Sequence, residues 1–326
     1  MHDDAVHDAV RPGAVRVNAT PEQTAIAERL EGSSPGAGLL WGFVGVVAFS
    51  FTVPFTRVAV EELSPLFIGA GRAVVAAVLA GAALAITRQR LPRGRQWARL
   101  AVVAAGVVAG FPLLTSWALQ TTDASHGAVV IALLPAATAV AAVLRAKERP
   151  SRSFWVFAVL GAVAAVGFAA MQGGGRAGLT WADLLLFGAV VAAAIGYAEG
   201  GLLARELGAW QTVSWALVVA SPVMLALSLW SAAVQPPQAS SVSWLAFAYL
   251  AAVSMFLGFF AWYRGLAIGP MAQVSQVQLV QPVMSILWAA LLLGEQVGWA
   301  TVLGGVAVIV CAGLAMRMRG RRPVRP

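Results

Sequence analysis

The stretch WALQTTDASHGAVVIALLPAATAVAAVLRAKE, residues 117–148, recurs in outline 147 residues later as RGLAIGPMAQVSQVQLVQPVMSILWAALLLGE, residues 264–295. The two segments align without a gap. Each contains a proline near its middle (Pro135 or Pro282) and ends in a glutamate (Glu148 or Glu295). Identical residues also occupy four further pairs of positions, Leu119/Leu266, Val130/Val277, Ala142/Ala289 and Leu144/Leu291. The shared spacing of proline and glutamate predicts an internal duplication.

The composition excludes a soluble domain. Hydrophobic residues make up 60% of the 326 residues and charged residues only 11%, whereas a soluble domain has roughly 25% charged residues. One cysteine, Cys311, permits neither an internal disulfide framework nor a cysteine cluster for zinc. The P-loop pattern G-x-x-x-x-G-K-[ST] is absent, so ATP is not the direct energy source. We expect an integral membrane protein without cofactor or metal, whose partners are the lipid bilayer and a small-molecule substrate.

Ten apolar runs are long enough to cross the roughly 30 Å hydrocarbon core, which takes about 20 residues per helix. The fold class expected is therefore all-α integral membrane, with ten transmembrane helices. Short breaks separate most runs, so neighbouring helices should be antiparallel. The expected spans are 37–56, 65–87, 98–119, 126–145, 154–172, 181–203, 210–232, 243–263, 271–293 and 297–316.

The distribution of cations predicts the topology, because loops rich in Lys and Arg remain cytoplasmic. With the N-terminus inside, the inner loops and the two tails hold nineteen of the 22 Lys and Arg residues. Only Arg57 and Arg176 lie outside, and Arg72 lies within the second span. We expect both termini to be cytoplasmic. The net charge of +8 is then a topology signal, and no nucleic-acid partner is expected.

Five spans in each half place the halves in opposite orientations. Inverted repeats are typical of secondary transporters, whose substrate sites lie near the membrane midplane between the halves. Two other classes stay open, a membrane-embedded enzyme and a lipid-handling scaffold, although the spans lack paired acids for catalysis. We expect a monomer or a homodimer. The expected organisation is a cytoplasmic tail (1–36), a first five-helix repeat (37–172), a second repeat (181–316) and a basic cytoplasmic tail (317–326).

Three segments carry a family resemblance: AFSFTVPFTRVAVEELSPLFIGAGRAVVAA (48–77), ALQTTDASHGAVVIALLPAATAVAAVLRAKERP (118–150) and GLAIGPMAQVSQVQLVQPVMSILWAALLLGEQ (265–296). Together they resemble the drug/metabolite transporter superfamily, specifically proteins with two tandem EamA modules. The resemblance implies a ten-helix basket in the bacterial inner membrane that exports a small metabolite by alternating access. Amino-acid exporters, among them exporters of aromatic amino acids, and cationic-drug exporters share this pattern.

The first span departs from one feature of the superfamily. Small multidrug members carry a proton-coupling glutamate there, whereas this chain has Ser50 and Thr52 and no acid. An antiport mechanism copied from those proteins is therefore in doubt. We expect Ser50 and Thr52 to line the substrate pathway.

Ionisable residues inside spans are costly and usually face a cavity. Arg72 lies early in the second span, where the resemblance implies an arginine with a structural role, paired with carbonyls or with Glu61 and Glu62. Glu199 is the acid expected deepest in a span. It could carry a proton or bind a cationic group, or pair with Arg205 near the cytoplasmic end. Tyr197 lies two positions away, so it should point to a different face.

The ninth span carries so many amides that a water-filled lining is expected, because lipid would leave their donors unpaired. Gln273, Gln276 and Gln278 are the candidates for the pathway. The repeat equivalents in the fourth span are mostly apolar. His126 is expected at the outer mouth as a surface histidine paired with Asp123.

Aromatic residues close two spans. Phe259, Trp262 and Tyr263 end the eighth span and Trp117 ends the third. They form either an interfacial belt or an aromatic wall that stacks a planar substrate. Pro135 and Pro282 are candidate matched hinges. The leading interpretation is an exporter of amino acids, aromatic ones favoured, with a multidrug exporter as the alternative.

Overall fold

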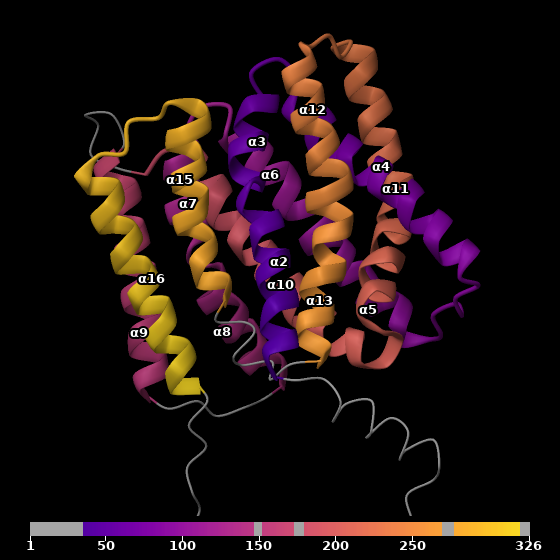
Figure 1. Cartoon of the computed structure of the whole chain (residues 1–326), viewed down its shortest axis with the longest axis horizontal. Coiled ribbons are helices and arrows are strands. Elements are labelled where there is room, and N and C mark those ends of the chain that lie inside the picture. The colour runs from indigo at the N-terminus through magenta and orange to yellow at the C-terminus, as the bar shows by residue number, and fades with distance from the viewer. Residues whose placement is uncertain (1–34, 147–151, 173–178, 269–276, 320–326) are drawn as a thin grey trace, which may run out of the picture.

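The structure is a computed structural model that describes residues 35–146, 152–172, 179–268 and 277–319. Its secondary structure is helical throughout these ranges (Figure 1). The first half contains α2 (Pro35–Ser50), α3 (Thr52–Ala59), α4 (Pro65–Ile86), α5 (Arg95–Val103), η1 (Ala104–Gly110), α6 (Phe111–Ala118), α7 (Ala124–Ile131), α8 (Leu134–Ala146) and α9 (Arg152–Gln172). The second half contains α10 (Trp181–Leu207), α11 (Ala209–Val234), α12 (Ser241–Tyr249), η2 (Leu250–Leu257), α13 (Gly258–Ile268), η3 (Gln278–Val280), α15 (Gln281–Leu293) and α16 (Trp299–Arg319).

Seven helices in the described ranges are long and apolar enough to cross a membrane. Three shorter apolar helices accompany them, Trp155–Ala165, Gln278–Leu293 and Trp299–Cys311. The all-helical membrane class is therefore confirmed, whereas the expected count of ten spans is met only in part. The N-terminal tail up to residue 34 and the C-terminal tail from residue 320 lie outside the described residues.

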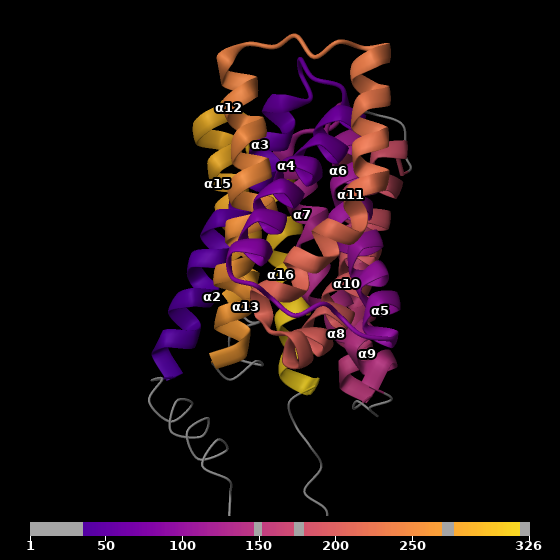
Figure 2. The same ribbon diagram turned by 90° about the vertical axis from the view of Figure 1, so that its right-hand side faces the viewer.

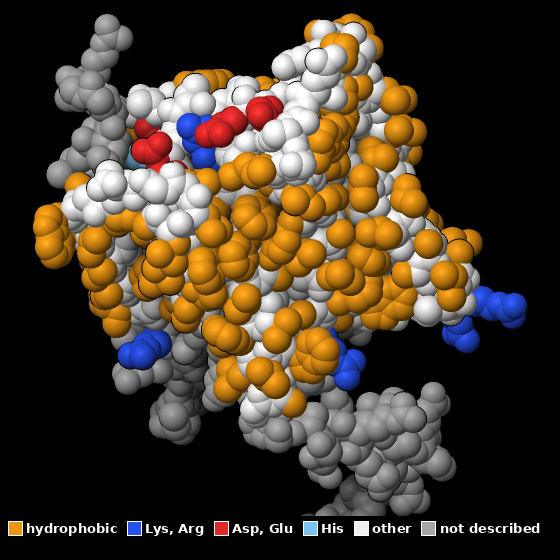
Figure 3. Space-filling model, turned by 45° about the horizontal axis from the view of Figure 1, so that its top comes forward, with side chains coloured by type: hydrophobic (Ala, Val, Ile, Leu, Met, Phe, Trp, Pro, Cys, Tyr) orange, Lys and Arg blue, Asp and Glu red, His pale blue; other side chains and the backbone are white. Residues whose placement is uncertain are grey.

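The helices lie side by side, and the two ends of the described chain, at Pro35 and Arg319, lie on one side of the bundle (Figure 1). The α11–α12 connection (235–240) lies on the opposite side, which is the upper side in Figure 2. Figure 3 shows hydrophobic side chains covering the sides of the molecule, acidic side chains gathered beside a cationic one on its upper face, and further Lys and Arg side chains at the lower border. This distribution fits a protein embedded in a bilayer.

Prolines mark where the spans break. Pro135 and Pro282 each occupy the second position of a helix, α8 or α15, after a break or a 3-10 turn. A proline in the first helical turn removes no helical hydrogen bond, so it starts a new segment instead of kinking a continuous one. Matching segments in the two halves also contain a π-helix, η1 in the third span and η2 in the eighth. Neither π-helix was expected from the sequence.

Glycines permit several close helix crossings, and two of them lie between the halves. A Cβ on Gly45 of α2 would meet the Trp262 backbone of α13 at 2.9 Å. A Cβ on Gly106 of η1 would lie 2.3 Å from the Ala192 carbonyl oxygen of α10. Small residues permit such backbone approach in lipid, where hydrophobicity does not drive helices together. The first helix of each half therefore packs against the third helix of the other.

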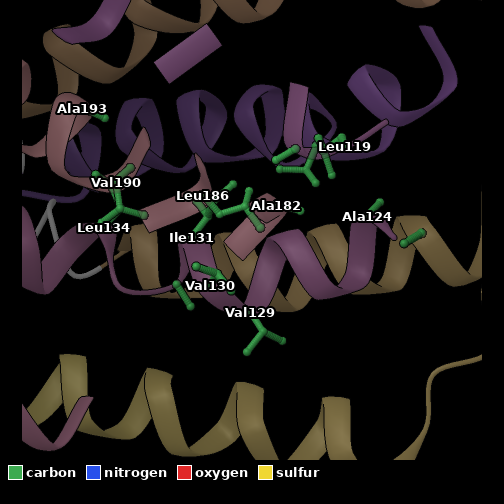
Figure 4. Close-up of a cluster of buried hydrophobic side chains, with 14 of the residues drawn as sticks. Leu119, Ala124, Val129, Val130, Ile131, Leu134, Ala182, Leu186, Val190 and Ala193 are labelled. Atoms are coloured by element: carbon green, nitrogen blue, oxygen red, sulfur yellow. The ribbon is translucent and has the colours of Figure 1, made fainter. Parts of the chain in front are cut away.

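A buried hydrophobic cluster joins α7 to α10 in the middle of the bundle (Figure 4). Val130 and Ile131 of α7 belong to the same cluster as Leu186 and Val190 of α10, whereas Val129 points away from α10 toward α16. Because the two helices come from different halves, this cluster fixes the position of the fourth span against the sixth.

Candidate functional site

A small central pocket lies where helices of both halves meet. Its volume is about 40 Å³, room for only a few water molecules. Its polar lining comes from Thr52, Arg72, Tyr197, Ser254 and Gln281. Its aromatic lining comes from Phe49, Phe111 and Phe259, and the remaining lining residues are Val53, Val107, Pro112, Leu134, Ala193 and Met255. The pocket thus combines aromatic faces with a few polar groups.

Two hydroxyls of this pocket bridge the halves. The Oγ1 of Thr52 in α3 lies 2.7 Å from the Oγ of Ser254 in η2. Gln281 borders both this pocket and a smaller neighbouring one of about 10 Å³, which Gln278 and Ser285 also line. The Oε1 of Gln281 is buried and has no hydrogen-bond partner among the described residues. The polar ninth span therefore does face the interior where the structure describes it.

Arg72 lies in this pocket and is 1% exposed. Within the described ranges its Nε has no hydrogen-bond partner and its guanidinium forms no ion pair. The expected pairing with Glu61 or Glu62 is wrong: Glu61 pairs with Arg57 at 3.4 Å, and Glu62 accepts from the Ser240 amide at 2.8 Å. Arg72 lies seven residues beyond the start of α4, about 10 Å deeper in the bundle.

A larger cavity of about 1360 Å³ lies between α5, α8, α9 and α10. Most of its lining is apolar, and its charged rim comes from the first turns of α5 and from the C-terminal parts of α8 and α10. These helix ends lie on the lower side of the bundle in Figure 1. The charged lining residues are Arg95, Arg99, Arg145, Glu199 and Glu206.

Glu199 is the centre of this rim. Its carboxylate accepts hydrogen bonds from Arg99 of α5 and, at 2.7 Å, from the Nε of Arg145 of α8. Arg99 also pairs with Glu206. The Arg205 side chain lies outside the described residues. In the sequence, Arg99 and Arg145 served only to predict the topology. Arg99 lies 100 residues and Arg145 lies 54 residues from Glu199, so no local spacing connects them with it.

Tyr197 and Glu199 face different cavities, the central pocket and the larger one. This agrees with two positions separated by roughly 200° around a helix. Tyr197 is therefore the sixth-span residue that reaches the central pocket, whereas Glu199 belongs to the charged rim.

The expectation for His126, a surface histidine paired with Asp123, is wrong. His126 is 9% exposed, and its Nε2 lies 2.6 Å from Oδ1 of Asp183, so it is neither a surface residue nor a partner of Asp123. Asp183 is fully buried and, with Thr180, forms the capping box at the start of α10. The role of Asp183 was not predicted, because the sequence does not show whether a residue at the edge of a span is buried. The capping pattern T-x-x-D at 180–183 could have revealed it.

The remaining candidates are spread over the bundle. Ser50 is fully buried in a helix contact, where its Oγ accepts from the Nε1 of Trp288 at 2.9 Å. Trp262 and Tyr263 are 4% and 3% exposed, so they form no interfacial belt; Phe259 is the member of that group that lines the pocket. Trp117 is 40% exposed. Gln273 and Gln276 lie outside the described residues.

Among the described residues, no group of three or more His, Cys, Asp or Glu side chains could hold a metal ion. The arrangement offers a central pocket between helices of both halves and a separate charged rim at one end.

The model of the EamA-like transporter family matches this chain twice, over residues 36–170 and 180–317. The chain belongs to the EamA-like transporter family. It carries two EamA modules of the drug/metabolite transporter superfamily and is a multi-pass membrane transporter.

Two curated relatives are similar over most of their length. An uncharacterized transporter, YdeK of Bacillus subtilis (strain 168), is 47% identical over 286 residues, 86% of this chain and 97% of that protein. A probable terminal-alkyne amino-acid exporter of Streptantibioticus cattleyicolor is 26% identical over 298 residues, 88% of this chain and 98% of that protein. These names describe transporters rather than enzymes.

A solved crystal structure has a similar fold. It superposes with a TM-score of 0.60 at 18% identity and covers 88% of this chain and 98% of the other. At this identity the likeness concerns the fold alone.

Proposed function

We propose that this EamA-family protein is a secondary transporter that exports small metabolites, with amino acids as the main class and aromatic ones favoured. It would act in the bacterial inner membrane as a monomer or homodimer of two inverted five-helix repeats, with both termini in the cytoplasm. The relative named as a probable amino-acid exporter supports this substrate class.

The central pocket is the observation that carries the proposal. Phe49, Phe111 and Phe259 offer ring faces to an apolar side chain, and Thr52 and Gln281 offer polar groups to its backbone part. About 40 Å³ is too small for an amino acid, so the halves must move apart for substrate to enter. Alternating access by rocking of the repeats supplies that movement.

Export is tested with purified protein in liposomes loaded with radiolabelled phenylalanine, leucine or alanine. We expect phenylalanine to leave faster than from protein-free liposomes, and faster than alanine. A folded protein that moves no amino acid in either direction overturns the proposal.

A matched pair of variants locates the pathway. Phe259→Ala removes a ring from the pocket, whereas Phe43→Ala removes a ring that is 42% exposed on the outer surface. Efflux of phenylalanine should fall about twofold to tenfold in Phe259→Ala, since one aromatic pair is worth about 0.5–1.5 kcal/mol beyond its buried area. Phe43→Ala should transport normally. Equal effects of the two variants would argue against this pocket.

Proton coupling is tested at Glu199. Its two ion pairs would have to break for it to carry a proton. If Glu199→Gln retains the same pH dependence of transport as the unaltered protein, Glu199 is not the carrier.

A further inference from the structure

We propose that Arg72 is the anchor for the carboxylate of the transported substrate. The inference rests on the proposed export function and makes it narrower: the substrate must present an anionic group at the bundle centre. The observation behind it is a buried guanidinium that borders the central pocket and lacks an acidic partner among the described residues.

The absence of a partner for the Arg72 Nε among the described residues matters because the side chain is buried. Arg72 is the largest fully buried side chain of the described chain, at 1% exposed. An arginine inside a membrane-spanning helix normally finds an opposite charge or backbone carbonyls, because an isolated charge there is costly. Its Nε contacts neither in the part of the chain that the structure describes. A group that arrives from the pocket would satisfy the charge.

The acidic side chains of the described residues lie away from Arg72, and most of them bind other groups. Glu199 and Glu206 pair with Arg99. Asp183 binds His126, and Glu295 accepts from the amides of α7. Glu61 binds Arg57, Glu62 binds Ser240, and Asp123 is exposed at the start of α7. None of these acids lines the central pocket, so a mobile anion is the partner that remains for Arg72.

The other pocket groups define the rest of the ligand. Gln281 presents a buried Oε1 that receives no hydrogen bond from a described residue, which suits an ammonium group. Phe259, Phe49 and Tyr197 supply apolar faces, and a ring face also attracts a cation. A carboxylate, an ammonium and an apolar side chain together describe an α-amino acid. A purely cationic drug lacks the group that Arg72 requires and would place a second positive charge beside it.

The decisive experiment varies the ligand and leaves the protein unaltered. Binding of radiolabelled phenylalanine to the detergent-solubilised full chain is competed with phenylalanine, 3-phenylpropionate and phenylalaninamide. 3-Phenylpropionate keeps the carboxylate and lacks the amine, whereas phenylalaninamide keeps the amine and has no carboxylate. A hydrogen bond to a charged group is worth about 1.5–3 kcal/mol, so we expect phenylalaninamide to compete about tenfold to a hundredfold more weakly than phenylalanine.

Substitutions then assign the carboxylate to Arg72. Arg72→Gln should reduce affinity for phenylalanine to about that for phenylalaninamide, while its affinity for the amide should change little. Arg72→Lys, which keeps the charge, should restore part of the preference. Arg57→Gln is the matched control, because Arg57 forms only a surface ion pair with Glu61; it should bind all three ligands normally. Size-exclusion profiles and melting temperatures establish that each variant is folded.

The outcomes separate this proposal from the export function. Transport of phenylalanine and of its amide at equal rates would overturn the carboxylate anchor and leave amino-acid export intact. A preference for carboxylates that survives in a folded Arg72→Gln would also overturn it. Failure of every amino acid to bind or move would overturn both. If Arg72→Gln does not fold, the ligand series and Arg72→Lys carry the test.

Discussion

The two ends of the bundle are held together by different kinds of contact. At the upper end, carboxylates bind backbone amides across the halves: Glu295 accepts from Ala124 and Ser125 at 2.7 and 2.9 Å, and Glu62 accepts from Ser240 at 2.8 Å. At the lower end, the connections run between long side chains, Glu199 with Arg99 and Arg145. A cavity of about 1360 Å³ opens beside these side chains.

The difference between these contacts indicates which end of the bundle opens more easily. A carboxylate on the amides of a helix N-terminus needs both helix ends in register, and the helix dipole favours it. Arginine side chains are long enough to follow a moving partner and keep their charge contact. The lower end therefore combines a cavity with ion pairs between long side chains. The upper end is held by carboxylates bound directly to backbone amides. Four substitutions test this contrast, from the largest expected effect to the smallest.

Asp183→Ala should be the most destabilising change at the upper end. Asp183 accepts from the Thr180 amide at 2.8 Å and the Thr180 hydroxyl at 2.6 Å, and it pairs with His126. Loss of a cap and of a buried charged partner should cost about 2–4 kcal/mol. Thermal unfolding in detergent measures it. Asp123→Ala is the control, because Asp123 precedes α7 without a side-chain cap bond; a similar loss there would contradict this role of Asp183.

Glu199→Gln should loosen the lower end. The Glu199 carboxylate is 6% exposed and holds two arginines, of which Arg145 is 54% exposed. The loss should be about 1–3 kcal/mol, less than for a fully buried pair because water can reach Arg145. A cysteine at Ala194 in the larger cavity, in a Cys311→Ser background, should then react faster with a thiol reagent. An unchanged labelling rate and melting temperature would refute the idea that Glu199 holds this end together.

Glu295→Ala should open the upper end at a cost of about 1 kcal/mol, the usual value of one helix cap. A cysteine at Ala128, which lies on α7 and lines the pocket of about 10 Å³ beside the central one, should become accessible to a membrane-impermeant thiol reagent. Glu61→Ala is the control, since the Glu61 side chain is 60% exposed and binds only Arg57. Equal labelling in both variants would mean that Glu295 does not close this end.

Glu62→Gln should have the smallest effect, and it should depend on pH. Hydrogen bonds from Ser243 and Ser240 lower the pKa of the Glu62 carboxyl. A carboxyl with a lowered pKa stabilises the fold above its unfolded pKa, and that stability is lost as the pH falls through the folded value. The unaltered protein should melt slightly above Glu62→Gln at neutral pH, and the gap should vanish below the ordinary glutamate range. A gap that is constant with pH would contradict this.

Several features could be predicted from the residues alone. Composition predicted a membrane protein. Pro135 and Pro282 were predicted as matched hinges; the structure places each at the second position of a helix segment, and their role as hinges stays a prediction. Thr52, Tyr197 and Phe259 were candidates for the pathway and do line the central pocket. Polar groups in an apolar span usually face the interior of the bundle. Such features are readable because they depend on local composition and spacing.

The partners of the charged residues could not be predicted from local composition and spacing. The alternatives for Glu199 were a proton carrier, a group that binds a cation and a partner of Arg205; in the structure Arg99 and Arg145 hold it. His126 was expected with Asp123 and binds Asp183. Arg72 was expected to have a partner, and its Nε has none among the described residues.

What the sequence by itself determined is the class of protein, its duplicated organisation and its family, since these follow from hydrophobicity, spacing and shared motifs along the chain. The tertiary structure alone decided which side chains meet. Contacts between distant spans depend on how each helix is rotated and shifted against its neighbours. Close crossings such as Gly45 with Trp262 and Gly106 with Ala192 set those rotations, and no local pattern in the sequence encodes them.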